Sequence, residues 1–140
     1  MKGAGLTAII VDDDYNTVVT FTDILEFNGI RVVGTGYTGK DAVKMYEKLR
    51  PNVVFLDVMM PKPHDGFYAL ENIRKINPNA TVIMITADLT VETEDRLQNL
   101  CAHAIVYKPF DIKKILQILD EMMTKNIRTV KAIHDKQNLA

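Results

Sequence analysis

The sequence lacks the features that direct a protein to a membrane or to an oxidising compartment. Its 140 residues contain one cysteine, Cys101, and no tryptophan. One cysteine excludes a disulfide within the chain and fits a reducing cytosol. Uninterrupted apolar runs stay well below the roughly 20 residues of a membrane span. Asp12 ends the first apolar stretch too early for a signal peptide. We therefore expect a cytoplasmic protein without a membrane segment.

An excess of charge of one sign is also missing. Lys and Arg total 17 against 18 for Asp and Glu, which gives a formal net charge of −1. Because binding to nucleic acid or to anionic lipid relies on a basic excess, we expect no direct contact with either. Apolar residues make up 47% of the chain, enough for one sizeable core. The length suits a single domain.

Short apolar runs alternate with helical patterns along the chain. The predicted strands cover residues 6–11, 31–34, 53–56, 81–86 and 104–107. The predicted helices cover residues 18–28, 41–49, 67–76, 90–100 and 112–123. Strands that alternate with helices indicate a parallel sheet with helices on both faces. We therefore expect an α/β fold, a doubly wound five-stranded parallel sheet with five helices in a three-layer sandwich.

Polar side chains stand at the carboxyl ends of four predicted strands. They are Asp12, Asp13 and Asp14 after the first strand, Asp57 after the third, Thr86 at the end of the fourth and Lys108 after the fifth. Taken alone, Asp14 is equally well explained as the N-cap of the following helix. Ligands of doubly wound sheets bind beyond the carboxyl ends of the strands. We therefore expect these side chains to converge on one rim.

The residue types at this rim suit the transfer of a phosphoryl group. Asp12, Asp13 and Asp57 would repel one another unless a cation lay between them. Oxygen ligands favour Mg²⁺, with Mn²⁺ as an alternative. A divalent cation and the Lys108 ammonium can neutralise phosphoryl oxygens, and the Thr86 hydroxyl can bond one of them. One aspartate can then act as the nucleophile and form an acyl phosphate.

These motifs resemble the receiver domain of two-component response regulators over residues 5–124. The resemblance is carried by Val11-Asp12-Asp13-Asp14, Leu56-Asp57-Val58-Met59-Met60-Pro61, Asp65-Gly66, Ile85-Thr86-Ala87 and Tyr107-Lys108-Pro109-Phe110. It implies a flavodoxin-like fold of the receiver type. It also implies a cis peptide bond before Pro109, which an X-Pro bond permits at low cost.

The resemblance assigns Asp57 as the phosphoacceptor. Asp13 and Asp57 would ligate Mg²⁺ directly, together with the backbone carbonyl of Met59. Asp12 would act mainly through a metal-bound water. Met59 and Asp88 would set how long the phosphoryl group lasts.

The resemblance also predicts residues of a conformational switch. Lys108 would pair with the phosphoryl group, and Thr86 would move towards it after transfer. The position that usually carries a switching aromatic ring holds Ile105 in this chain. Tyr107 lies on the same face of that strand and could partly substitute for the ring.

Two further positions depart from the usual receiver pattern. The loop after the acceptor, residues 60–66, is one residue longer than usual, lacks the first glycine and contains Pro61 and Pro63. Two prolines stiffen it, so partner contacts there should differ from the family norm. Cys101 replaces a usual glycine, and we interpret it as a small turn residue or a small hydrophobe.

The resemblance implies a signalling domain and not an enzyme that acts on external substrates. A sensor histidine kinase or a phosphotransfer protein would supply the phosphoryl group, and the same pocket would slowly hydrolyse it. The phosphorylated form would bind a downstream protein through the fourth helix, fifth strand and fifth helix. Phosphorylation-linked pairing of two copies stays open. Residues 125–140, with four basic residues and one acidic one, are expected to form a tail or to extend the last helix.

A glycine-rich stretch also resembles two kinds of nucleotide-binding motif, but less well. Gly34, Gly36 and Gly39 fit the dinucleotide-binding pattern G-x-G-x-x-G, and with Lys40 they nearly form a P-loop. The pattern starts on the second predicted strand and leaves the strand-end residues without a role. Asp41 replaces the hydroxyl of a P-loop and would bring a negative charge to the phosphates. We interpret the stretch as a glycine-rich turn.

Two alternatives for the strand ends stay open. Asp12-x-Asp14 resembles the nucleophile motif of haloacid-dehalogenase-type phosphohydrolases. Such an enzyme needs an acidic pair beyond the lysine, and it would leave Asp57 without a role. The other alternative is a pseudo-receiver, an interaction module that is not phosphorylated. The presence of all five pocket residues argues against it.

Overall fold

The computed structural model describes residues 5–124 and contains one parallel sheet with the strand order β2-β1-β3-β4-β5. The strands are β1 (Thr7–Val11), β2 (Arg31–Gly36), β3 (Val53–Asp57), β4 (Val82–Thr86) and β5 (Ala104–Tyr107). The helices are α1 (Tyr15–Phe27), α2 (Gly39–Leu49), α3 (Gly66–Ile76), α4 (Val91–Asn99) and a last helix at residues 112–124. The predicted fold class is confirmed. The predicted tail, residues 125–140, lies outside the described residues.

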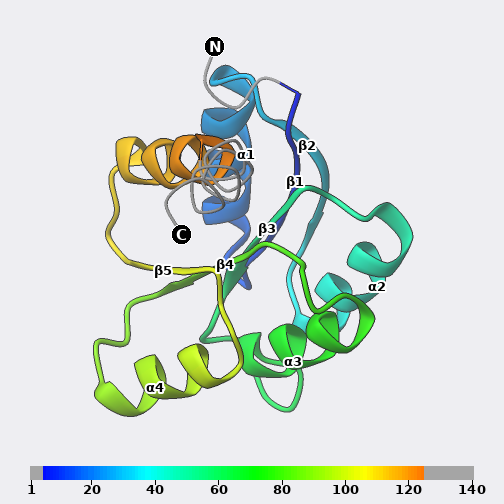
Figure 1. Cartoon of the computed structure of the whole chain (residues 1–140), viewed down its shortest axis with the longest axis vertical. Coiled ribbons are helices and arrows are strands. Elements are labelled where there is room, and N and C mark those ends of the chain that lie inside the picture. The colour runs from blue at the N-terminus through cyan, green and yellow to red at the C-terminus, as the bar shows by residue number, and fades with distance from the viewer. Residues whose placement is uncertain (1–4, 125–140) are drawn as a thin grey trace, which may run out of the picture.

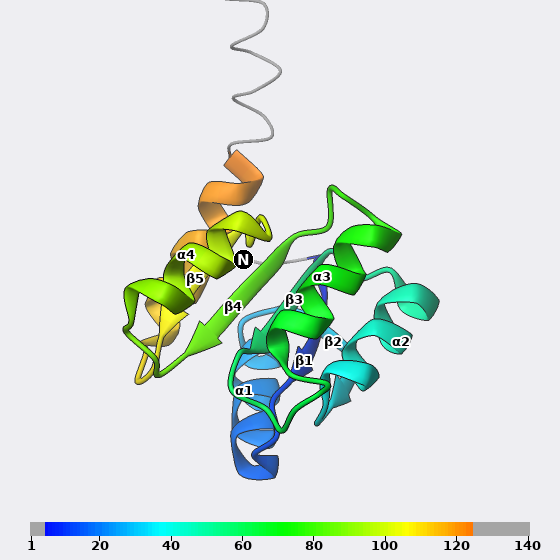
Figure 2. The ribbon, with the colours of Figure 1, turned by 90° about the horizontal axis from the view of Figure 1, so that it is seen from below.

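The sheet separates two apolar layers because alternate strand residues point to opposite faces. Val54 and Leu56 pack in the cluster beneath α2, α3 and α4, whereas Val53 and Phe55 pack towards α1 and the last helix. Figure 1 shows these helices on the two sides of the sheet, and Figure 2 shows the layer of α2, α3 and α4 from below. All five residues of β3 are buried, as expected of a central parallel strand.

Side-chain caps fix where the helices begin near the strand ends. Thr38 accepts a hydrogen bond from the backbone N–H of Asp41 at the start of α2, and Asp65 accepts one from Tyr68 at the start of α3. Such caps satisfy backbone donors that a helix leaves unpaired in its first turn. Asp14 occupies the N-cap position of α1, but its side chain makes no capping hydrogen bond to the backbone and instead accepts one from the Thr17 hydroxyl.

Close backbone approach explains one glycine of the G-x-G-x-x-G stretch and the glycine at the start of α3. A Cβ on Gly39 would lie 2.4 Å from the carbonyl oxygen of Asp65, and a Cβ on Gly66 would lie 2.3 Å from that of Asp57. The N–H of Gly39 also donates to the carbonyl of His64. Gly39 therefore holds the 60–66 loop, whereas Gly34 and Gly36 belong to β2, so only Tyr37 and Thr38 form the predicted turn between the strand and α2.

Two backbone predictions can be compared directly with the structure. The peptide bond between Lys108 and Pro109 is cis, as predicted, and the bond between Lys62 and Pro63 is also cis, which was not predicted. Cys101 has a φ of 62°, the left-handed conformation that favours glycine, and it is exposed. It is therefore a turn residue and not a buried hydrophobe. Among residues 5–124, no helix is both long enough and apolar enough to span a bilayer.

Candidate functional site

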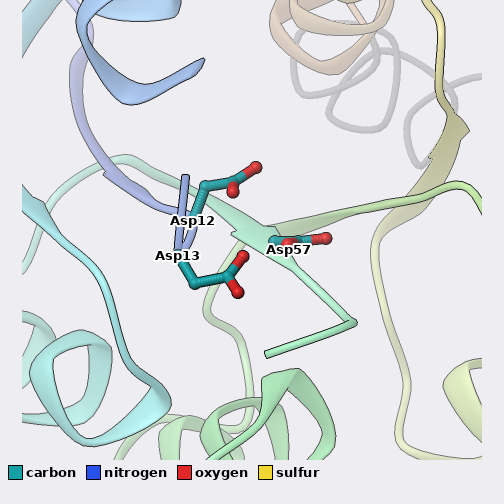
Figure 3. Close-up of side chains that lie close together, drawn as sticks. All are labelled: Asp12, Asp13 and Asp57. Carbon is teal, nitrogen blue, oxygen red and sulfur yellow. The ribbon is translucent and has the colours of Figure 1, made fainter. Parts of the chain in front are cut away.

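Three carboxylates meet where β1 and β3 end. Asp12 and Asp13 directly follow β1, and Asp57 is the last residue of β3, its neighbour in the sheet. One oxygen from each carboxylate lies within 4.8 Å of the others. Figure 3 shows the side chains of Asp13 and Asp57 reaching into the same space beside Asp12. Asp12 and Asp57 are each only 5% exposed, while Asp13 is open to solvent. The predicted convergence of these residues is confirmed.

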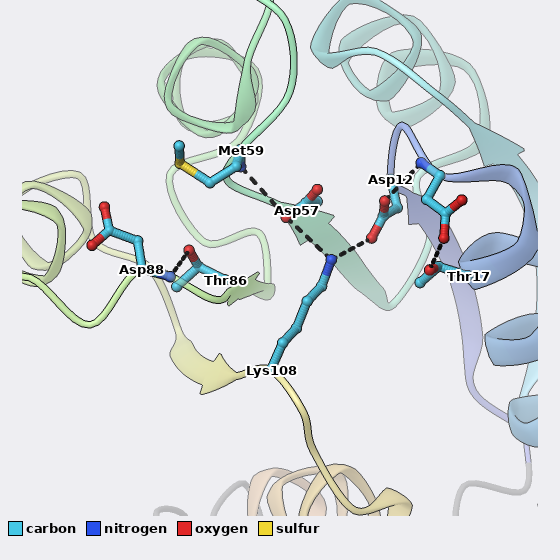
Figure 4. Close-up of polar contacts among 8 residues, drawn as sticks. Asp12, Thr17, Asp57, Met59, Thr86, Asp88 and Lys108 are labelled. Carbon is cyan, nitrogen blue, oxygen red and sulfur yellow. Dashed lines mark hydrogen bonds and ion pairs between the residues drawn. The ribbon is translucent and has the colours of Figure 1, made fainter.

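Lys108 reaches this acidic group from the end of β5. Its Nζ lies 2.8 Å from Oδ2 of Asp12 and 3.6 Å from Oδ1 of Asp57 (Figure 4). Burial works against the charge of the ammonium, but the hydrogen bond to Asp12 and the charge of Asp57 outweigh it and raise the pKa of Lys108. The ammonium therefore bridges two buried carboxylates and lies nearer to Asp12 than to Asp57.

Asp57 carries the most perturbed carboxyl group of the site. Burial and the neighbouring charge of Asp12 raise its pKa from 3.8 to about 6. The Lys108 ammonium and the N–H of Met59, 3.4 Å from Oδ1, act in the opposite direction without cancelling this effect. A carboxyl group in this state favours any partner that adds positive charge beside it.

The donor set fits a hard divalent cation. If Asp12, Asp13 and Asp57 are all ionised, the single Lys108 ammonium leaves them with two uncompensated negative charges. Their oxygens are the ligand type that Mg²⁺ and Mn²⁺ prefer, and three ligands leave room for the waters that Mg²⁺ retains. Met59, two residues beyond Asp57, lies at the same rim (Figure 4). Its carbonyl as a further ligand stays a prediction.

Thr86 ends β4 with its side chain fully buried. Its hydroxyl accepts a hydrogen bond from the N–H of Asp88, 3.0 Å away. Its carbonyl accepts one from the N–H of Lys108 at 2.8 Å, which joins β4 to β5 beside the acidic group. The structure thus places Thr86 on the rim as predicted, with its hydroxyl engaged in the loop that leads to α4.

The two predicted switch residues of β5 lie on the α4 side of the sheet. Ile105 is half-buried and packs against the cluster beneath α2, α3 and α4. Tyr107 pairs in register with Thr86, and its pKa is raised by burial and by the neighbouring Glu94 of α4. The shared face predicted for the two residues is confirmed, while their part in switching stays a prediction.

Sequence reasoning missed a set of side-chain bonds around Asp88. One carboxylate oxygen of Asp88 accepts a hydrogen bond from the Thr90 N–H at 2.9 Å, and the other accepts one from the Thr93 hydroxyl at 2.6 Å. Thr90 also caps α4. The spacing Asp-x-Thr-x-x-Thr, just before a helical pattern, is a recognisable signal for such a cap and could have identified Thr93.

The loop between Asp57 and α3 is held from within and from α2. Asp65 is buried and caps α3, and the N–H of Gly66 donates to the carbonyl of Val58. The His64 ring packs edge-on against Tyr68, with ring centroids 4.7 Å apart. Lys62 is exposed. These contacts hold the loop, with its extra residue, between Asp57 and α3.

Asp14 and Asp57 lie in different surroundings. Asp14 is exposed, and its carboxylate is bonded to the Thr17 hydroxyl of its own helix. Asp57 is buried, and the Lys108 ammonium lies between it and Asp12. A dehalogenase-type nucleophile would instead come from the Asp12-x-Asp14 motif, which leaves the most perturbed carboxyl group of the site without a role.

Comparison with known proteins agrees with this geometry. The profile of the response regulator receiver domain matches residues 8–120. The chain is 35% identical over 118 residues to the chemotaxis protein CheY of Treponema pallidum, which covers 83% of this chain and 81% of that protein. It is 30% identical over 118 residues to the chemotaxis protein CheY of Thermotoga maritima, which covers 84% of this chain and 98% of that protein.

Solved structures show the same fold. In the CheX-CheY-BeF3-Mg+2 complex from Borrelia burgdorferi, one chain superposes with a TM-score of 0.79 at 32% identity, covering 86% of this chain and 91% of that one. A CheY-like receiver domain protein from Methanospirillum hungatei superposes with a TM-score of 0.76 at 28% identity, covering 86% and 98%. Receiver domains are signalling domains that bind Mg²⁺ at a cluster of aspartates, and Asp12, Asp13 and Asp57 form such a cluster. The chain belongs to the response regulator receiver domain family.

Proposed function

We propose that this chain is a phosphorylation-controlled switch in which Asp57 accepts a phosphoryl group from a phosphohistidine. The donor is a sensor histidine kinase or a phosphotransfer protein, and the phosphorylated form binds a downstream protein. The observation that carries the proposal is the position of Asp57, buried among Asp12, Asp13 and Lys108 with its pKa raised to about 6. CheY-like receivers interact with histidine kinases and with downstream targets, and this chain has their fold and their aspartate cluster.

Asp13 and Asp57 would hold Mg²⁺ directly with the Met59 carbonyl, and Asp12 would hold it mainly through water. When bound, the cation supplies positive charge to the phosphoryl oxygens. An oxygen of the Asp57 carboxylate attacks phosphorus in line, the new O–P bond replaces the N–P bond of the donor, and the imidazole leaves. Lys108, whose Nζ lies 3.6 Å from Asp57, would pair with a phosphoryl oxygen on that residue.

The signal would leave the pocket through β4 and β5. Thr86 moves towards the phosphoryl group, and the loop to α4 and the face of α4, β5 and the last helix change with it. The downstream protein binds on this face. Ile105 and Tyr107, on the α4 side of β5, adjust to the new position of Thr86. The same pocket slowly hydrolyses the acyl phosphate, so the chain acts on its own phosphoryl group and not on external substrates.

The proposal includes an organisation and a location. Residues 5–124 form the receiver unit, and residues 125–140 form a tail or extend its last helix. The protein acts in the cytoplasm, in keeping with its single cysteine. Pairing of two phosphorylated copies is an additional outcome that light scattering can detect.

Labelling of the acceptor tests the proposal. The full chain is incubated with acetyl phosphate and Mg²⁺, and its intact mass is measured for wild type, Asp57→Asn and Asp23→Asn, the last a matched change at an exposed residue of α1. We expect wild type and Asp23→Asn to gain one phosphoryl group and Asp57→Asn to gain none. Equal labelling of Asp57→Asn would overturn the acceptor assignment. An unlabelled wild type would instead indicate a pseudo-receiver, and sustained hydrolysis of a phosphomonoester lost in Asp12→Asn would indicate a phosphohydrolase.

A further inference from the structure

The loop from β4 to α4 is tied to both of its neighbours through Asp88. The backbone N–H of Asp88 donates to the Thr86 hydroxyl at 3.0 Å. The Asp88 carboxylate accepts from the Thr90 N–H at 2.9 Å and from the Thr93 hydroxyl at 2.6 Å. Thr86 is the residue expected to move on phosphorylation, and Thr93 is buried in the first turn of α4. Asp88 therefore connects the two through its backbone and its side chain.

The carboxylate of Asp88 faces α4 and not the phosphoacceptor. Figure 4 shows it directed away from Asp57, with the backbone nitrogen of Asp88 on Thr86. The hydrogen bond from Thr93, with those from Thr90, lowers the pKa of Asp88, so this carboxylate is ionised and its bonds are of the stronger, charge-assisted kind. In this arrangement Asp88 cannot contact a group on Asp57 through its side chain.

We propose that Asp88 is a positioning residue that ties the Thr86 hydroxyl to the first turn of α4 and holds the switch in its unphosphorylated arrangement. This inference rests on the proposed function, because it describes how the phosphoryl group on Asp57 is sensed. It also changes the role that the resemblance suggests for Asp88. Any influence of this residue on the phosphoryl group is exerted through Thr86 and α4.

The geometry explains why movement of Thr86 reaches α4. If the Thr86 hydroxyl shifts towards a phosphoryl group, either its bond to the Asp88 N–H breaks or Asp88 moves with it. If Asp88 moves, its carboxylate leaves Thr93, and the first turn of α4 loses that bond. Part of the interaction with the phosphoryl group is thus used to break this connection. Weakening it should make the activated form easier to reach.

A change of Thr93 to valine isolates this bond. Valine keeps the branched shape of threonine and removes only the hydroxyl, and the half-exposed Asp88 carboxylate remains hydrated. Because the phosphoryl mimic no longer has to break this bond, we expect Thr93→Val to bind it about three- to tenfold more tightly than wild type. Thr93→Ser restores the hydroxyl and should return the affinity to that of wild type. Asp88→Ala removes this bond and also the one from the Thr90 N–H, and it should tighten binding in the same direction.

The experiment is a titration of the full chain with beryllofluoride in Mg²⁺, followed by amide NMR shifts of the β4–α4 loop and of α4. Tighter binding by Thr93→Val and Asp88→Ala, with smaller shifts in α4, supports the connection, because a merely structural defect would weaken binding. Unchanged or weaker binding by both variants, with a normal response of wild type and Thr93→Ser, overturns the connection alone. Failure of wild type to bind the mimic overturns the proposed function and this inference together.

Discussion

At Asp57, burial and two neighbouring carboxylates disfavour the charge that the proposed chemistry needs. These effects raise the pKa of Asp57 to about 6, whereas the pKa of an aspartate in an unfolded chain is about 3.9. The folded protein therefore retains a proton on Asp57 between about pH 4 and 6 that the unfolded chain has lost. The stabilising contribution of this group is complete below about pH 4 and disappears as the pH rises through about 6.

This sign predicts that Asp57→Asn stabilises the metal-free protein at neutral pH. Asparagine is uncharged and keeps an oxygen that can accept the Met59 N–H. After a discount for solvent screening, we expect the free energy of unfolding to rise by about 1–2 kcal/mol at pH 7.5, and to change little at pH 4. Urea unfolding in a chelator at both pH values measures it. A destabilised Asp57→Asn at pH 7.5 would contradict the raised pKa.

Lys108 has the opposite role, since its ammonium bridges Asp12 and Asp57. Without metal, Lys108→Met leaves two buried carboxylates without their cation, and we expect the free energy of unfolding at pH 7.5 to fall by about 1–3 kcal/mol. Lys113→Met, at an exposed position of the last helix, is the matched control. Addition of Mg²⁺ should recover part of the loss in Lys108→Met and nothing in the control. Equal effects of the two changes would show that Lys108 does not stabilise the acidic group.

The pairing of Lys108 also shows which features of the site the sequence could predict and which it could not. One rim was predictable from the positions of polar residues at the ends of strands that alternate with helices. These residues are Asp12, Asp13, Asp57, Thr86 and Lys108. That Lys108 lies 2.8 Å from one carboxylate and 3.6 Å from the other was not predictable, because side-chain rotamers and local charge decide it.

At the scale of the element, α3 begins directly behind the acceptor. A Cβ on Gly66 would lie 2.3 Å from the backbone oxygen of Asp57 and 2.6 Å from the Cα of Val58. Because these are backbone atoms, Gly66→Ala must displace β3 or α3, and we expect a loss of about 1–3 kcal/mol in unfolding free energy with weaker Mg²⁺ binding. Urea unfolding and a Mg²⁺ titration measure both. Glu71→Ala, on the exposed face of α3, is the control and should leave Mg²⁺ binding unchanged.

The ends of the strands and helices differ in how accurately the sequence predicts them. β3 is buried along its whole length and carries a continuous apolar run. Its observed end at Asp57 lies one residue beyond the predicted end. The prediction for β2 stopped two residues before its end at Gly36. This strand lies at the edge of the sheet and carries no continuous apolar run that would mark its end in the sequence. α2 begins at Gly39, two residues before its predicted start, because the Thr38 cap and the contact of Gly39 with the 60–66 loop start the helix there.

At the scale of the whole molecule, ligand binding and stability must be linked. A ligand that binds only the folded state stabilises it by about 2.7 kcal/mol at a hundred times its dissociation constant. Mg²⁺ with beryllofluoride should therefore raise the melting temperature of wild type in a concentration-dependent way. Asp57→Asn should show no beryllofluoride-dependent rise. A similar rise in both proteins would place the bound mimic somewhere other than Asp57.

The layered fold also predicts which part of the chain suffices for this response. The receiver family profile covers residues 8–120, and both faces of the sheet carry an apolar layer formed by residues of the 5–124 segment. We therefore expect a chain that ends at residue 124 to melt cooperatively and to be labelled by acetyl phosphate to the same extent as the full chain. A truncated chain that folds but is not labelled would show that residues 125–140 help to form the phosphorylation site, and it would refute the proposed division of the chain.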